Sequence, residues 1–153
     1  MKFDKINNVL YLQMGTSSRI GIIKGGKIRS IYVHFDGYVL GVGKFLVENL
    51  ETEEKIEEFI SHGDRSSVES NDYYKDSPEQ EDNHQSDFIT EFVGRCLKQY
   101  CEYFYLFYGG EWNVANRFED YNLENNSFTF SSLKNKLKLK LIEKEEEEES
   151  EEE

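Results

Sequence analysis

Cysteine, proline and long apolar runs are all scarce in this sequence of 153 residues. The two cysteines, Cys96 and Cys101, lack the neighbouring ligands of a zinc site, so we interpret them as reduced thiols. The single proline, Pro78, excludes a proline-rich linker. No segment approaches the ~20 apolar residues of a membrane helix, and Met1–Asp4 leads into no apolar signal region. We therefore expect a soluble protein in the cytoplasm, with no membrane partner and no cofactor.

Charge is distributed unevenly along the chain. The net charge is −13, yet residues 1–50 carry +4 and residues 51–90 carry −10. Residues 91–130 and 131–153 carry −3 and −4. Phosphates would repel so acidic a molecule, and we expect no direct binding of nucleic acid. The basic N-terminal third leaves room for a smaller anion.

Two Gly-Gly pairs predict two β-hairpins. The flanking strand-like segments are 18–24 and 27–35 around Gly25-Gly26, and 102–108 and 111–117 around Gly109-Gly110. Glycine supplies the positive φ that a two-residue hairpin turn requires. A short alternation of apolar residues over Val9–Met14 predicts a further strand.

Helical spacing and capping residues predict helices over 44–50, 53–61 and 87–100. Thr52 can cap the second of them, and Ser86 or Asp87 the third. Segment 131–142 fits a helix capped by Ser131 or Ser132, or an edge strand, and we prefer the helix. Residues 64–86 are predicted to form a mobile acidic loop, and 143–153 a disordered poly-Glu tail.

The predicted fold class is α+β, in a single domain over residues 1–142. We expect an antiparallel sheet built from the two hairpins plus the N-terminal strand, with three or four helices packed on one face. Tyr103, Tyr105, Phe107 and Trp112 of the second hairpin are interpreted as sheet core, with a base-stacking platform as the alternative.

Several motifs resemble a family of small, uncharacterised bacteriophage proteins. They are Gly15-Thr16-Ser17-Ser18-Arg19-Ile20-Gly21, His34-Phe35-Asp36-Gly37-Tyr38, Gly41-Val42-Gly43-Lys44, Thr52–Ile56, Gly63–Ser67, Glu102–Phe107 and Gly110–Trp112. Members of that family begin with Gly-Thr-Arg-Ser and contain a His-Trp-Asp-Gly-Tyr turn before Gly-Val-Gly-Lys. Here Phe35 replaces the Trp, Val39-Leu40 replaces a Pro-Glu pair, and Tyr73–Asp76 lacks the arginines of an Arg-Asp-Arg-Gly segment. The resemblance implies the setting of phage infection and no particular activity.

The register of the first hairpin separates its side chains onto two faces. One face carries Ile20, Ile22, Ile31, Val33 and Phe35 and is predicted to be the core face. On the other face Gly21 lies opposite Ser30, which predicts a shallow gap beside Arg19, Tyr32 and His34. Such a gap can admit a planar ligand, although the 37–50 segment or a second subunit could equally cover it. The candidate ligand-binding residues are Arg19, Gly21, Arg29, Ser30, Tyr32, His34, Asp36, Tyr38 and Lys44.

The remaining motifs each have a structural alternative. Gly41–Lys44 offers backbone N–H groups and a lysine for an anion, or forms a plain loop-to-helix turn. His34 and Asp36 could support acid–base chemistry, but no nucleophile accompanies them and Asp36-Gly37 is a strong turn former. The acids of 51–90 form a solvated face or imitate DNA phosphates, and the Glu145–Glu153 run solubilises the chain or binds a partner. No metal site and no catalytic constellation is identified.

Two functions follow as expectations for a protein that is not an enzyme. The first is a phage counter-defence protein that binds and sequesters a small anionic, nucleotide-type immune signal in the host bacterial cytoplasm. A homo-oligomer could enclose such a ligand. The alternative is an inhibitor of a host defence nuclease, of the anti-CRISPR type, whose acidic surface mimics DNA. A phage accessory protein that acts on host metabolism is a third, less specific reading.

Overall fold

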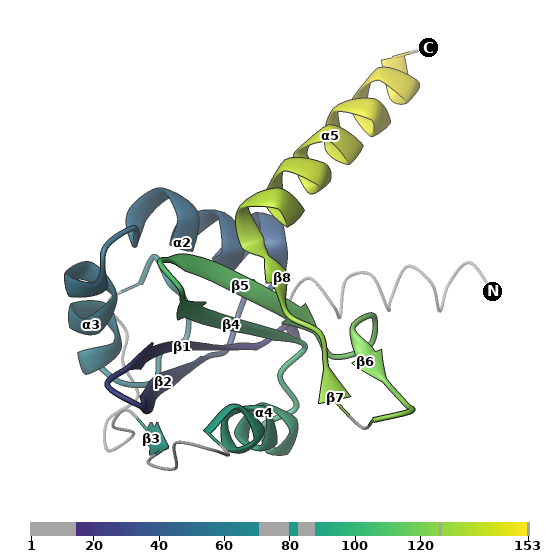
Figure 1. The fold of residues 1–153 in the computed structure, drawn as a ribbon. Helices are drawn as coiled ribbons and strands as arrows, with labels where there is room; N and C mark the ends of the chain where they lie inside the picture. The colour runs from purple at the N-terminus through teal and green to yellow at the C-terminus, as the bar shows by residue number, and fades with distance from the viewer. Residues whose placement is uncertain (1–14, 71–79, 83–87, 126, 153) are drawn as a thin grey trace.

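A computed structural model of the chain describes residues 15–70, 80–82, 88–125 and 127–152. They form a six-stranded sheet with the strand order β3-β2-β1-β4-β5-β8, beside a small two-stranded sheet of β6 and β7. Helices cover the larger sheet, and one long helix projects from the body (Figure 1). The α+β class predicted from the sequence is confirmed.

The first hairpin consists of β1 (Ser18–Lys24) and β2 (Lys27–Val33). Gly25 and Gly26 adopt φ of 61° and 76°, which is the left-handed conformation that a type I′ turn needs. The pairing places Gly21 opposite Ser30, as predicted from the sequence. Phe35 departs from the prediction, because the chain leaves the sheet after Val33 and Phe35 is 40% exposed.

The second hairpin, β4 (Tyr103–Tyr108) and β5 (Glu111–Asn116), is also confirmed. It joins the first through β1 and β4, which run parallel to each other. The expectation of a purely antiparallel sheet is therefore wrong. A parallel pair needs a long crossover, and here the chain between β2 and β4 supplies it.

The sheet is apolar on both faces, so helices pack on both, and the prediction of one covered face is wrong. The main core cluster, which includes Ile20, Ile31 and Tyr105, lies on one face. Ile28, Phe104 and Leu106 alternate with those residues and form a second cluster with Phe92. Four elements pack on the first face: the π-helical turn η1 (Val39–Gly43) and the helices α2 (Lys44–Asn49), α3 (Glu53–Ser61) and α5 (Leu133–Glu152). Helix α4 (Phe88–Lys98) packs on the second face.

The ends of the helices follow from local hydrogen bonds. Thr52 caps α3 as predicted, because its Oγ1 accepts from the Lys55 N–H at 3.3 Å. Ser132 caps α5 in the same way, because its Oγ accepts from the Asn135 N–H at 3.4 Å. Residues 143–152, expected to be a disordered tail, continue α5 to Glu152. The Lys, Leu and Glu that make up most of α5 are good helix formers.

The remaining strands are short: β3 (Gln80–Asp82), β6 (Tyr121–Asn122), β7 (Ser127–Phe128) and β8 (Ser131–Ser132). Strand β3 lies inside the segment predicted to be a mobile loop, and pairs with β2. The predicted strand 9–14 and the caps Ser86 and Asp87 lie outside the described residues. None of the described helices is long and apolar enough to cross a bilayer.

Candidate functional site

Two segments that carry the family resemblance meet beside the end of β2. The Asp64 carboxylate accepts from the Tyr32 N–H at 2.8 Å, and the Arg65 N–H donates to the Tyr32 carbonyl at 2.9 Å. The N–H groups of His34 and Phe35 then donate to the carbonyls of Arg65 and Ser66, at 3.1 and 2.9 Å. The 63–67 segment therefore forms an isolated parallel bridge to the end of β2 and fixes the start of the His34–Tyr38 turn.

Arg65 holds the chain that follows this contact. Its buried guanidinium donates to the carbonyls of Ser67, at 2.8 Å, and Ser70, and it lies 4.3 Å from the centre of the Phe59 ring. Hydrogen bonds from a cation that also stacks on an aromatic face are strong. The 67–70 segment is thereby held next to the His34–Tyr38 turn.

The turn itself is compact and partly strained. Asp36 has a φ of 58°, which is uncommon for a residue with a side chain. Its carbonyl accepts from the Val42 N–H at 2.8 Å, and a Cβ on Gly41 would lie only 2.3 Å from that oxygen. Strained backbone of this kind is often found at functional sites, which makes the surrounding surface a candidate site.

The Gly41–Lys44 segment does not offer free amides for an anion. The N–H groups of Gly41 and Gly43 donate to the Tyr38 carbonyl, at 3.0 and 3.4 Å, and that of Val42 is used by Asp36. Helix α2 is also only six residues long. The loop-to-helix interpretation is therefore the better one, and the glycines serve close packing.

A pocket of about 320 Å³ opens where these segments meet. Its wall includes three of the predicted ligand-binding residues, Asp36, Tyr38 and Lys44. The full lining, which we call the motif pocket, is Asp36, Tyr38, Leu40, Gly41, Lys44, Phe45, Glu48, Asn49, Ser67, Val68 and Glu69. The volume lies at the small end of the range of ligand pockets, about 300–1,000 Å³.

The motif pocket is more acidic than the sequence suggested. Lys44 is the one cation among its lining residues, and it shares the wall with Asp36, Glu48 and Glu69. Burial raises the pKa of the Tyr38 phenol, as do the negative charge of Asp36 and a hydrogen bond with it. Tyr38 therefore stays a neutral hydrogen-bond group at physiological pH. The lining thus combines many acceptors with one positive charge and the Phe45 ring.

The gap predicted on the hairpin is closed. A Cβ on Gly21 would meet the Phe92 ring of α4 at 3.0 Å, and the side chains of Ile28 and Leu106 at 3.2 Å. Helix α4, rather than the 37–50 segment or a second subunit, covers this face (Figure 1). Gly21 and Ser30 are interior residues in consequence.

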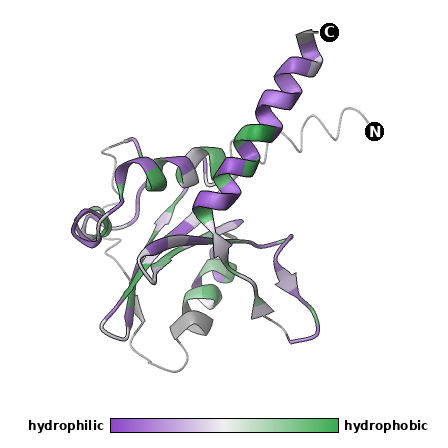
Figure 2. Cartoon of the chain, turned by 45° about the horizontal axis from the view of Figure 1, so that its top comes forward, coloured by the Kyte–Doolittle hydropathy of each residue, from purple (hydrophilic) through white to green (hydrophobic). Residues whose placement is uncertain are grey.

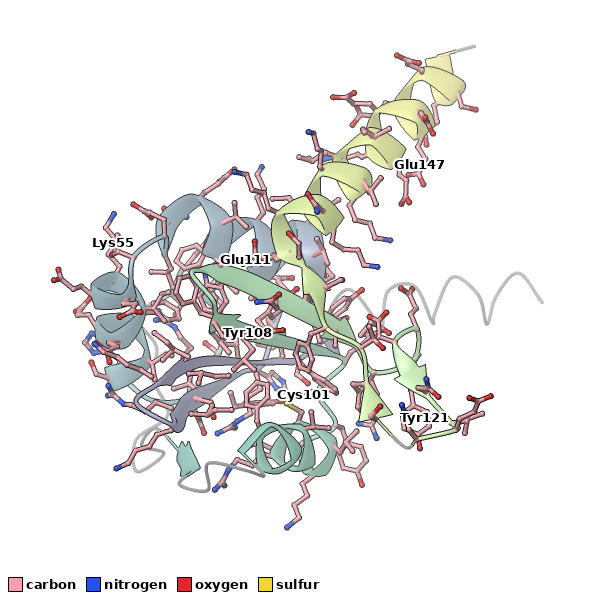
Figure 3. The ribbon with its side chains drawn as sticks, in the orientation of Figure 1. Lys55, Cys101, Tyr108, Glu111, Tyr121 and Glu147 are labelled. Carbon is pink, nitrogen blue, oxygen red and sulfur yellow. The ribbon has the colours of Figure 1, made fainter. Side chains whose placement is uncertain are left out.

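Arg19 is buried in the same interface. Its Nε donates to Ser30 Oγ at 2.9 Å and its Nη1 to Gln99 Oε1 at 2.6 Å, so it joins β1 and β2 to the end of α4. Burial lowers the pKa of its guanidinium. Nearby Cys96 and Cys101 (the latter labelled in Figure 3) are both buried and form no disulfide. Burial raises the pKa of the Cys96 thiol. This cluster is a structural connection across the second core.

The other predicted site residues are divided between two places. Arg29 lies 3.5 Å from Glu57 of α3, on the opposite face of the sheet. Tyr32 Oη and His34 Nδ1 are 2.9 Å apart, and the His34 ring packs edge-on against Phe35 with ring centres 4.4 Å apart. Neither Tyr32 nor His34 lines the motif pocket.

Much of the described acidic surface at 51–70 is paired with basic groups. Lys24 lies 3.6 Å from Glu53 and 3.2 Å from Glu57. Lys55, which is labelled in Figure 3, is paired with Glu51 at 2.5 Å. These pairs also occupy Lys24, one of the bases that make the N-terminal third positive. Exposed pairs of this kind are weak, but they reduce the net potential of both surfaces.

Glu48, Asn49, Ser67 and Glu69 are pocket residues that the sequence reasoning missed. Glu48 follows Lys44 by four positions, so helical spacing could have placed both on one face of α2. Asn49 and Glu69 carry no such signal, because their position depends on contacts between distant segments. Within the described ranges, no group of three or more His, Cys, Asp or Glu residues could hold a metal ion.

Comparison with protein-family models, curated proteins and solved structures gave no match to this chain. The functional argument therefore depends on the site itself and on the motifs that form it.

Proposed function

We propose that this protein is a non-enzymatic phage counter-defence protein, acting in the host bacterial cytoplasm, that sequesters a small nucleotide-type signal in the motif pocket. One observation carries the proposal. Two segments that resemble the phage family, at 34–44 and 63–67, are joined by backbone hydrogen bonds. The motif pocket opens where these segments meet.

The dimensions and charges of the pocket narrow the ligand class. A volume of about 320 Å³ suits a nucleoside or mononucleotide better than a dinucleotide. Three carboxylates in the wall disfavour a ligand with several phosphates, whereas Lys44 can pair with one. The carboxylates can accept hydrogen bonds from the amino group of a base, and the Phe45 ring can pack against its plane. Among the small anions expected from the basic N-terminal third, we therefore favour a singly charged mononucleotide.

The inhibitor hypothesis has less support. Its acidic surface at 51–90 includes acids that are paired with Lys24, Arg29 and Lys55 in the described part of the chain. A DNA mimic needs carboxylates whose field is open to a basic partner.

Isothermal titration calorimetry against a nucleotide panel tests the proposal. The panel contains adenosine, cyclic AMP, cyclic GMP, ADP-ribose and a cyclic dinucleotide. We expect binding of a cyclic mononucleotide, weaker binding of the corresponding nucleoside and the weakest binding of ADP-ribose. Lys44→Gln should weaken cyclic mononucleotide binding by about tenfold or more, since it removes a charge-assisted hydrogen bond.

Lys27→Gln is the matched control, because Lys27 is an exposed lysine at the tip of the first hairpin and lies outside the pocket lining. It should leave the affinity unchanged. Absence of heat across the whole panel would refute the proposed ligand class. Equal effects of the two lysine variants would refute the proposed site.

A further inference from the structure

Helix α5 carries its charges in two separate blocks. Lysines occupy positions 134, 136, 138, 140 and 144, whereas glutamates occupy 143, 145–149, 151 and 152. Only the base of the helix is held by the body, where Leu133 and Leu137 are buried against the main core. The remainder projects into solvent, with Glu147 on the free part (Figure 3). In Figure 2 the lower half of α5 carries both hydrophobic (green) and hydrophilic (purple) positions, whereas its upper half is coloured as hydrophilic.

The free part of α5 also exposes apolar side chains on one face. Leu139 and Ile142 are 58% and 46% exposed. At about 100° per residue, both lie on the side of the helix opposite Leu133 and Leu137. Asn135 and Glu146 fall on the same side, so the spacing along this seam alternates between four and three residues. That spacing is typical of a helix that pairs with another helix.

The charges flank this seam in a regular way. Lys134, Lys138, Glu145 and Glu149 lie along one flank, and Lys136 and Glu143 along the other, by the same helical geometry. Lys140, nearer the side that faces the body, forms an i,i+3 ion pair with Glu143 at 3.6 Å within the helix. Each flank therefore carries lysines near the body and glutamates near the tip.

We propose that two copies of this chain associate through antiparallel pairing of their α5 helices. A two-fold axis near Leu141 and Ile142 brings each flank against the same flank of the partner copy. Lys134 then faces Glu149 and Lys138 faces Glu145, both in one register. Leu139 and Ile142 of the two copies meet at the centre. Such a symmetric interface is isologous, as in most dimers.

The opposite arrangement is disfavoured by charge. Parallel helices would place lysines against lysines and glutamates against glutamates. The antiparallel contact spans residues 134–149, about 24 Å of helix at 1.5 Å per residue. It places the two bodies at opposite ends of the pair. Because its apolar centre is small, most of its specificity comes from exposed charge pairs, and it weakens as salt rises.

Sedimentation velocity of the full-length protein tests the proposal. The wild type should form a dimer at low salt, and its dissociation constant should rise by about tenfold or more between about 50 mM and about 500 mM NaCl. Changing the flank lysines 134, 136 and 138 to glutamate makes both flanks acidic, and changing the flank glutamates 143, 145 and 149 to lysine makes both flanks basic. Each variant alone should be monomeric, whereas an equimolar mixture should form a heterodimer.

The control variant reverses the charge of lysines that lie outside α5. Lys27→Glu combined with Lys55→Glu and Lys98→Glu alters exposed lysines on other elements and should leave self-association unchanged. Leu139→Ser with Ile142→Ser, which keeps every charge, should weaken the dimer by about tenfold or more and decides the matter if a charge variant does not fold. A wild type that stays monomeric at low salt would overturn the proposal. So would charge variants that dimerise as the wild type does.

Discussion

Tyr105 donates a hydrogen bond from its phenol to the carbonyl oxygen of Gly37 across 2.7 Å, although 68 positions separate the two residues. Tyr105 is fully buried in the middle of β4, and Gly37 lies inside the His34–Tyr38 turn. The bond therefore connects the sheet core to the turn whose Asp36 and Tyr38 line the motif pocket. It explains how a surface turn keeps the strained conformation of Asp36.

Tyr105→Phe should destabilise the fold by about 1–3 kcal/mol, because it leaves the buried Gly37 carbonyl without its partner. Urea unfolding followed by fluorescence measures the free energy of unfolding. Tyr100→Phe is the control, since Tyr100 is 80% exposed and loses only a solvated hydroxyl. Equal stability of the Tyr105 variant and the wild type would contradict the assigned hydrogen bond.

Gly41→Ala should destabilise the protein and abolish ligand binding. The added Cβ would lie 2.3 Å from the Asp36 carbonyl oxygen, so the turn must open to accept it. Gly94→Ala provides a matched contrast within α4, where a Cβ meets nothing within 4 Å. The latter change should stabilise the protein by about 0.5–1 kcal/mol, as expected for alanine in a helix interior. A neutral Gly41→Ala would show that the turn is less tightly packed than described.

Gly21→Ala tests whether the hairpin face is closed. On an open strand the change would be neutral or slightly stabilising. Against Phe92 at 3.0 Å it should instead cost about 1–3 kcal/mol through overpacking. In a Phe92→Leu background, which provides room, the cost should be smaller. Identical costs in the two backgrounds, measured as a double-mutant cycle, would contradict the contact.

Asp64 predicts a pH dependence of stability. Burial raises the pKa of its carboxyl above the ordinary 3.8, although the Tyr32 N–H and the charge of Arg19 oppose the shift. Between the unfolded and folded pKa values the folded state binds more protons than the unfolded state. The contribution of Asp64 to stability is therefore largest at low pH and is lost as the pH rises through that window.

The test compares the wild type with Asp64→Asn, which keeps an acceptor for the Tyr32 N–H. The stability of the wild type relative to this variant should fall as the pH is raised from about 3.5 to about 6.5. Urea unfolding at each pH gives the two free energies. A difference that grows with pH would mean that favourable charge interactions outweigh the burial of the carboxyl.

Local signals in the sequence predicted the two hairpins and their register, because a Gly-Gly turn fixes which residues face each other. They also predicted the cap of α3, and three of the candidate binding residues, Asp36, Tyr38 and Lys44, line the motif pocket. The parallel pairing of β1 with β4 depends on where a long crossover returns, which no local pattern records. The closure of the gap at Gly21 likewise depends on Phe92, more than 70 positions away. For this reason the candidate site lies at the motif pocket and not on the hairpin face that the sequence predicted.

The most direct test of the central claim maps a ligand onto the protein by NMR. Cyclic AMP is titrated into the isotopically labelled full-length chain while backbone amide signals are followed. The account predicts that the largest shifts fall at residues 36–49 and 67–69, around the motif pocket, and that Lys44→Gln reduces them at the same ligand concentration. Shifts that concentrate on residues 19–32 of the first hairpin, or no shifts at saturating ligand, would contradict it.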